Sequence, residues 1–208
     1  MRLSELQVDA YTQTLADASP APGGGSASAL MGAQGAALTA MVCALTLGRA
    51  ACAPHHPLAE AARTEAEALR RRFLNVMERD TEAFLTVSAA YAMPKADEAE
   101  RAARSEAIQQ GLMRCTQTPL LMMELSVQAL TLTAKLLGKF NQNAASDLGV
   151  AALSLRSCAQ GAWFNVLINI GMLKDQTLSA QYRGQGEALL SEALSLSEQI
   201  CQSIADLL

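Results

Sequence analysis

The sequence predicts an all-α fold, a single-domain bundle of about seven helices that includes two long buried ones. Of the 208 residues, 50% are hydrophobic and only 4% are aromatic, and alanine and leucine recur throughout, which favours helices over strands. Residues 58–91 contain neither proline nor glycine. No alternating run of valine, isoleucine and threonine bounded by turn residues occurs, so we expect no strands. A chain of this length forms one domain by default, over residues 1–208.

The N-terminal segment predicts a short helix and then a break. Ser4 begins a capping box, which starts a helix that runs to about Asp17. The glycine-rich segment Ser19–Gly25 interrupts it, and Ser26 is positioned to cap a second helix that ends near Leu47.

This second helix lies in a stretch, residues 18–48, that has no charged residue and is long enough to span a bilayer. Its content of alanine, glycine, serine and threonine indicates instead a buried helix of close contacts, with a subunit interface as one location. A membrane span is the alternative.

The middle of the chain predicts the longest helix and two shorter ones. The first runs over Leu58–Tyr91, with apolar side chains at spacings of three, four and seven residues. Pro94 stops it, and a short charged helix follows. Thr118 and Pro119 indicate the cap and first turn of another helix, which ends near Gly138.

The last part of the chain predicts two helices, over residues 144–173 and 177–208. The first has one purely apolar face, formed by Leu148, Ala152, Leu155, Ala159, Val166, Ile170 and Leu173. Its other face carries small or polar side chains, namely Asp147, Ala151, Ser154, Cys158, Gly161, Asn165 and Asn169.

Charge and cysteine usage exclude several classes of function. The net charge is -4 with a pI near 5.2, and no basic run is longer than Arg70-Arg71-Arg72, which lies in a glutamate-rich segment; this argues against nucleic-acid binding. The five cysteines have neither disulfide nor zinc-site spacing, so they are expected to be reduced core residues. Residues 1–17 lack the pattern of a secretory signal, and we expect a cytoplasmic protein.

Three features depart from a plain helical bundle. Asp80 falls on the apolar stripe of the long helix, where a carboxyl group has a raised pKa and suits proton transfer; a buried salt bridge explains it equally well. Asn165 and Asn169 lie one turn apart in an uncharged run, where they line a polar cavity or bond to a neighbouring helix. The Pro22–Ser26 loop precedes a helix and exposes backbone N–H groups, as a binding site or as a simple tight turn.

Short motifs along nearly the whole chain resemble one known family. The distinctive block is Pro20-Ala21-Pro22-Gly23-Gly24-Gly25-Ser26, followed by Gly32, Gly35, Met41 and Leu45-Thr46-Leu47-Gly48. Later landmarks are Asp80 with Phe84, Pro94-Lys95, Pro119, Ser146-Asp147, and Asn165-Val166 with Asn169. Together they resemble the formiminotransferase-cyclodeaminase C-terminal family, in its free-standing form.

The resemblance implies an all-helical fold that forms a homodimer, with the active site in a cleft near the subunit contact. It implies a tetrahydrofolate substrate that bears a formimino or methenyl group, no metal and no permanently bound cofactor. Neither nucleic acid nor a membrane is an expected partner. The chemistry belongs to one-carbon metabolism, which includes histidine degradation.

The resemblance also assigns residues. Asp80 matches the family's catalytic carboxylate, and Asp147 matches a landmark that is expected at the substrate. The loop at the folate site is matched by Pro22, Gly23, Gly24, Gly25 and Ser26. From their positions, Lys95 is expected to be a second catalytic residue that pairs with Asp80 or binds the glutamate tail of the substrate. Asn165 and Asn169 are expected to orient the pterin.

The activity implied is that of a formimidoyltetrahydrofolate cyclodeaminase, which closes a ring between N5 and N10 and releases ammonia. Methenyltetrahydrofolate cyclohydrolase is the alternative, because free-standing relatives include both and the residues do not separate them. A catalytically silent helical module that binds folate or a partner protein is the alternative from another class. A membrane-associated protein built on residues 18–48 is a further one.

Overall fold

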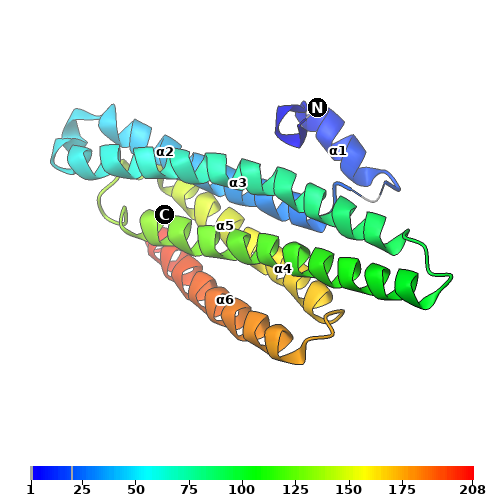
Figure 1. Cartoon of the computed structure of the whole chain (residues 1–208). Helices are drawn as coiled ribbons and strands as arrows, with labels where there is room; N and C mark the ends of the chain where they lie inside the picture. The colour runs from blue at the N-terminus through cyan, green and yellow to red at the C-terminus, as the bar shows by residue number, and fades with distance from the viewer. Residues whose placement is uncertain (1, 20) are drawn as a thin grey trace.

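The computed structural model describes residues 2–19 and 21–208, and Pro20 of the opening motif lies outside them. Figure 1 shows the helices in chain order. The elements are the 3-10 helix η1 (Leu3–Glu5), α1 (Val8–Ala16), α2 (Gly24–Leu47), the 3-10 helix η2 (Ala50–His55), α3 (His56–Tyr91), α4 (Glu98–Ala134), the 3-10 helix η3 (Gln142–Ala144), α5 (Ala145–Ile170) and α6 (Gln176–Ala205). The all-α prediction is confirmed, with six α-helices in the described residues instead of about seven.

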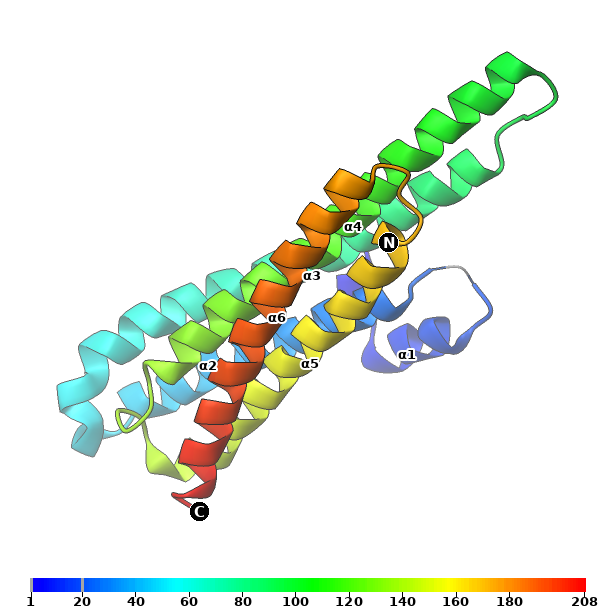
Figure 2. The same ribbon diagram turned by 90° about the horizontal axis from the view of Figure 1, so that it is seen from below.

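Helices α2 to α6 form an elongated bundle, and α1 lies outside it (Figure 1). α2 packs against α3 and α5, and α4 packs against α3, α5 and α6. The antiparallel pair α3 and α4 extends beyond the other helices at one end, as Figure 2 shows. Consequently the start of α2 meets the interior of α3 and the C-terminal half of α5, where Gly25 lies against Asp80 and Gly24 against Asn165.

The uncharged segment forms a buried helix, as predicted. Its small residues let α2 approach its neighbours closely, because a Cβ atom added at Gly32 would lie 2.4 Å from the Phe73 ring. By length and composition α2 is also apolar enough to cross a membrane, and half of that stretch is buried within the fold. In the bundle it is the helix between α3 and α5.

The prediction of two helices between Pro94 and Gly138 is wrong, because α4 runs without a break from Glu98 to Ala134. Pro119 lies inside it and has no N–H to donate to the carbonyl of Cys115, four residues earlier. The side-chain amide of Asn169 on α5 donates to that carbonyl instead, at 2.7 Å. A donor from another helix therefore satisfies the group that the proline leaves free.

The predicted caps at the N-terminus also differ from those observed. Ser4 does not cap a helix; its hydroxyl donates to the Glu78 carboxylate at 2.9 Å, and α1 begins only at Val8. α2 begins at Gly24, so Ser26 lies inside its first turn, where its hydroxyl bonds to that of Thr81 on α3 at 3.1 Å. In both places a partner on α3 replaces the local capping contact.

Candidate active site

A cavity of about 360 Å³ lies where the loop before α2 meets α3, α4 and α5. Its polar lining comprises Ser26, Asp80, Thr81, Ser88, Asn165 and Asn169. Its apolar lining comprises Phe84, Val87, Tyr91, Leu112, Ile168 and Met172. This mixture of an apolar wall with a few convergent polar groups is typical of a small-molecule site.

Asp80 is the only acidic side chain in this lining, within the part of the chain that the structure describes. Burial raises the pKa of its carboxyl group from 3.8 to about 6. Among the described residues, no lysine, arginine or histidine forms an ion pair with it and no hydrogen bond reaches it, so the buried salt bridge is not observed. A group that titrates near neutrality at a cavity wall is suited to general acid or base catalysis.

The glycine loop fits closely around this carboxyl group. A Cβ atom at Gly25 would lie 2.3 Å from Asp80 Oδ2, so only glycine lets the carboxyl group lie against this backbone. None of Gly23, Gly24 and Gly25 has a positive φ. The close fit is confined to Gly25, because an added Cβ would have no atom within 4 Å at Gly23 and would meet only the Asn165 amide, at 3.7 Å, at Gly24. The first N–H groups of α2 have no acceptor within the helix, and they border the cavity with the positive end of the helix dipole.

The two asparagines of α5 use their amide nitrogens for backbone contacts. Asn165 Nδ2 donates to the carbonyl of Gly161 at 2.8 Å, and Asn169 Nδ2 donates to the carbonyl of Cys115 at 2.7 Å. Because the partner in each contact is an acceptor, the nitrogen has to face it, and the amide oxygen is left for the cavity. The interhelical bond expected as one alternative is thus present for Asn169, and both residues also border the cavity.

The structure does not bring two of the predicted residues to this cavity. Lys95 is exposed in the connection after α3, and α3 alone continues for about 16 Å from Asp80 to Tyr91 at 1.5 Å per residue. Asp147 lies in the first turn of α5, about 27 Å along the helix from Asn165. The predicted pairing of Lys95 with Asp80 is therefore wrong, and Asp147 lies outside this cavity. Binding of the glutamate tail by Lys95 stays a prediction. Pro22 is buried next to the loop without lining the cavity.

Sequence reasoning missed several cavity residues. Thr81 and Ser88 share the α3 face with Asp80, so the helical spacing contained the signal for them. Cys115 comes from α4, and its nearness to Asp80 depends on helix packing alone. Burial and, to a smaller extent, the Asp80 charge raise the pKa of its thiol to about 11, which makes it a neutral part of the wall.

Comparisons with known proteins identify the family. The sequence model of the family described as formiminotransferase-cyclodeaminase matches residues 7–188. A methenyltetrahydrofolate cyclohydrolase of Methylorubrum extorquens is 35% identical over 197 residues, which cover 95% of each chain. The formimidoyltransferase-cyclodeaminase of Rattus norvegicus is 31% identical over 97% of this chain, which spans only 37% of the length of that protein.

A solved structure agrees with this result. The crystal structure of a formiminotetrahydrofolate cyclodeaminase from Thermotoga maritima superposes with a TM-score of 0.82 at 26% sequence identity, and it covers 100% of this chain and 98% of its own. The match therefore includes α1 and the loop that borders the cavity as well as the bundle. The chain belongs to the formiminotransferase-cyclodeaminase family.

Proposed function

We propose that this protein is an enzyme that acts at the N5–N10 bridge of a tetrahydrofolate derivative, with formimidoyltetrahydrofolate cyclodeaminase as its activity. The observation that carries the proposal is the unpaired Asp80 carboxyl group, with a pKa of about 6, in the wall of the cavity. The names of the relatives supply the substrate class.

In the cyclodeaminase reaction, N10 attacks the carbon of the protonated formimino group on N5. The resulting tetrahedral carbon carries N5, a protonated N10 and an amino group. Asp80 takes the proton from N10 and delivers it to the amino group, which leaves as ammonia as the N5–C–N10 methenyl bridge forms. One carboxyl group that accepts and returns one proton is sufficient for both transfers, and a pKa near 6 suits both directions.

Asn165 and Asn169 support recognition of the pterin ring. Their free amide oxygens are hydrogen-bond acceptors at the cavity, whereas the 2-amino and N3–H groups of a reduced pterin are donors. Asn165→Ala is therefore expected to raise the KM for the folate about tenfold, as is usual for loss of a hydrogen bond. Asn75→Ala, at an exposed position of α3 outside this cavity, is the matched control, and equal KM values for the two variants would contradict this role.

Methenyltetrahydrofolate cyclohydrolase is the second candidate, and the Methylorubrum extorquens relative favours it because that match extends over 95% of both chains. In this reaction Asp80 takes a proton from the water that attacks the methenyl carbon. The carbon then carries a hydroxyl group between N5 and N10. Asp80 returns its proton to N5 as the bond from the carbon to N5 breaks, and the hydroxyl group loses its own proton to solvent, which leaves the formyl group on N10. The same carboxyl group serves both reactions, so the cavity supports either.

The decisive experiment compares 5-formimidoyl- and 5,10-methenyltetrahydrofolate as substrates of the purified protein. The absorbance of the methenyl form rises in the first reaction and falls in the second. Turnover of the first substrate with release of ammonia supports the cyclodeaminase, and turnover of the second alone supports the cyclohydrolase. Binding of either folate without turnover identifies a catalytically silent binding module and refutes the proposal.

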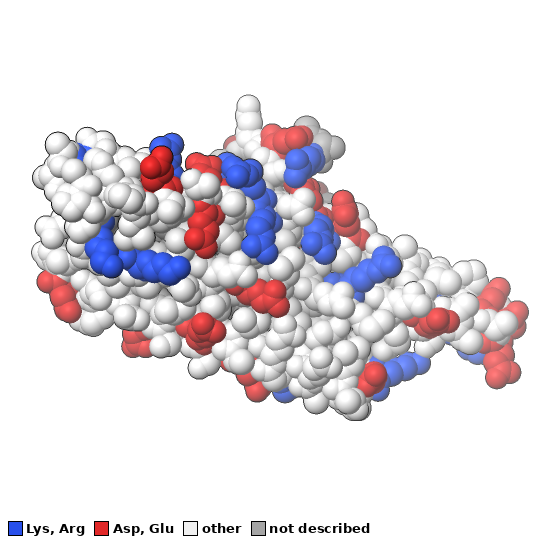
Figure 3. Space-filling view, turned by 60° about the vertical axis from the view of Figure 1, so that its left-hand side comes forward, with Lys and Arg blue, Asp and Glu red and all other residues white. Residues whose placement is uncertain are grey.

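The surface charge argues against a nucleic-acid partner. Acidic and basic side chains are interspersed on the face presented in Figure 3, without a basic field that suits nucleic acid.

We further propose a homodimer that uses the outer face of α5. This face carries large apolar side chains that are at least half exposed, namely Val150 (50%), Leu153 (51%), Phe164 (69%) and Ile168 (65%). They recur at helical spacing and form a single stripe. Because Ile168 also lines the cavity, a second copy on this stripe lies beside the site.

Sedimentation equilibrium at micromolar concentration tests the dimer. The wild-type protein is expected to sediment as a dimer, and Phe164→Lys is expected to shift it toward monomer. Val8→Lys, at an apolar residue on α1 that is 81% exposed and outside the stripe, is the control. A wild-type protein that is entirely monomeric refutes this arrangement.

A further inference from the structure

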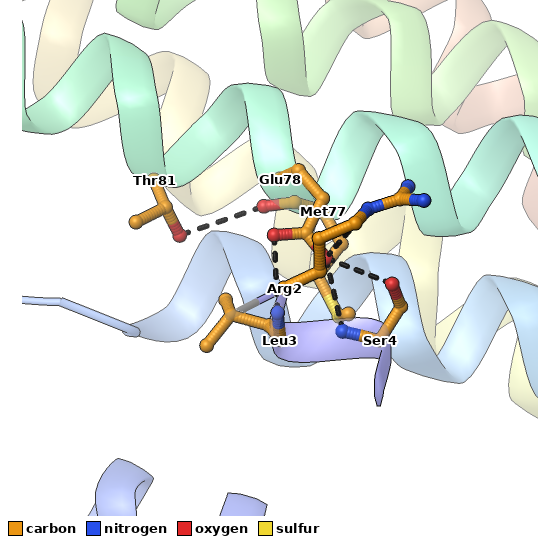
Figure 4. Close-up of polar contacts among 6 residues, drawn as sticks. All are labelled: Arg2, Leu3, Ser4, Met77, Glu78 and Thr81. Atoms are coloured by element: carbon orange, nitrogen blue, oxygen red, sulfur yellow. Dashed lines mark hydrogen bonds and ion pairs between the residues drawn. The ribbon is translucent and has the colours of Figure 1, made fainter. Parts of the chain in front are cut away.

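The first residues of the chain are tied to α3 beside the cavity. The Glu78 carboxylate accepts hydrogen bonds from the backbone N–H groups of Leu3 at 3.1 Å and Ser4 at 2.9 Å, and from the Ser4 hydroxyl at 2.9 Å. Arg2 adds an ion pair at 4.0 Å. Figure 4 shows these groups converging on Glu78. Glu78, the residue that these groups contact, lies only two residues before Asp80 on α3.

The other end of the N-terminal segment also leads to Asp80. α1 is followed by the loop that enters α2, and Gly25 at that point lies against the Asp80 carboxyl group. Both ends of residues 2–25 are thus fixed beside the same position of α3. Tyr11, which is 5% exposed, is the only buried residue of α1.

The Tyr11 hydroxyl is a buried polar group without a partner. Its oxygen has no hydrogen bond within the part of the chain that the structure describes. Such groups are rare in folded proteins, and each has an explanation in function, in a bound water or in a ligand. Burial raises the pKa of Tyr11, and the negative charge of Asp80 adds to this effect to a smaller extent.

We propose that Tyr11 is a positioning residue for Asp80, and that its hydroxyl is linked to the Asp80 carboxylate through one water molecule. Both groups are otherwise unpartnered, and a water between them has the polar neighbours that it requires. The catalytic meaning of this contact rests on the proposed function, whereas the contact itself does not. The N-terminal segment thereby becomes part of the active site.

Few other groups influence the titration of Asp80. Among the described residues of the packed elements, α4 contributes the Cys115 thiol, and α5 contributes only the neutral amides of Asn165 and Asn169 to the cavity. The part of α2 at the cavity has no ionisable side chain. A change in the pKa of Asp80 upon removal of the Tyr11 hydroxyl therefore reports on this contact.

The test is Tyr11→Phe, which removes one oxygen atom, with the pKa of Asp80 measured from the 13C resonance of its labelled carboxyl group. Loss of a donor to a carboxylate destabilises the charged form, so the pKa is expected to rise by roughly one unit. Tyr182→Phe is the matched control, because Tyr182 on α6 is also buried but its hydroxyl accepts from Gln117 at 3.2 Å, outside the cavity. An Asp80 pKa that is the same in Tyr11→Phe as in the wild type refutes the proposal.

The reverse measurement does not depend on the Phe variant folding. In Asp80→Asn the charge that raises the pKa of Tyr11 is absent, so the labelled ring carbon of Tyr11 is expected to titrate at lower pH while that of Tyr182 is unchanged. An unaltered Tyr11 titration refutes the contact.

If folate turnover is found, Tyr11→Phe is expected to shift the acidic limb of the pH profile to higher pH and to lower kcat several-fold, with KM nearly constant. Absence of turnover in the wild type refutes the proposed function alone, since both titrations still decide the contact.

Discussion

Replacement of Asp80 by Asn is expected to stabilise the protein while it abolishes most of its activity. The cavity wall raises the pKa of the Asp80 carboxyl group from 3.8 in the unfolded chain to about 6 in the folded one. A raised pKa in an acid means that folding favours the neutral form. The charge therefore does not change stability below about pH 3.8, and it destabilises the folded state increasingly as the pH rises to about 6.

The size of this effect follows from the shift. A difference of about two units corresponds to at most about 3 kcal/mol at pH 8, because each unit is worth 1.36 kcal/mol. Asn has nearly the same shape as Asp and no charge, so the variant is expected to recover much of this free energy at pH 8 and little at pH 4. Turnover of the folate is expected to fall by roughly 10²- to 10⁴-fold, the usual contribution of a general acid or base.

Urea denaturation at pH 4 and pH 8 measures the difference in the free energy of unfolding. Asp9→Asn, at an exposed residue of α1, is the control, with a change expected within about 1 kcal/mol at both pH values. A variant that is less stable than the wild type at pH 8 would refute the reasoning, since breaking a buried ion pair destabilises a protein. Wild-type turnover in the folded variant would instead exclude Asp80 from catalysis.

Three further results are expected. kcat/KM for the folate should fall as the pH drops below about 6, where Asp80 becomes protonated, and a profile that is flat between pH 5 and pH 8 would argue against it as the base. Gly25→Ala should lower kcat/KM about 10²-fold, because the new Cβ atom displaces the Asp80 carboxyl group by about 1 Å. Gly184→Ala is the control, since no atom lies within 4 Å of its added Cβ, and equal activities of the two variants would count against the close fit. EDTA should leave turnover unchanged, because no three His, Cys, Asp or Glu side chains come together in residues 2–19 and 21–208; restoration of lost activity by a divalent ion would contradict this.

The part of the site that could be predicted from the sequence lies on single helices. The spacing along α3 placed Asp80 on the stripe that also contains Phe73 and Met77, both fully buried, and the stripe continues as cavity wall through Phe84. Helical periodicity is a local property, so one sequence is enough to read it. The neighbouring Thr81 and Ser88 follow from the same geometry.

The residues that were misplaced or missed depend on how helices pack. Lys95 and Asp147 match short motifs, but long straight helices carry them far from the cavity, because each residue adds 1.5 Å along the axis. Tyr11 arrives from the opposite direction. It belongs to a segment whose first residues are anchored by Glu78 on α3, and no local pattern indicates that contact.

Pro119 shows why a local rule fails at the site itself. Taken alone, Thr118 and Pro119 indicate the start of a helix, since proline inside a helix leaves a carbonyl group without its donor. In the fold, Asn169 supplies the missing donor to the Cys115 carbonyl, and α4 continues. That same contact fixes the Asn169 amide with its oxygen available to the cavity that Cys115 also lines. The proline therefore does two things that only the tertiary structure reveals. It frees the Cys115 carbonyl group, and it thereby orients the Asn169 side chain at the cavity.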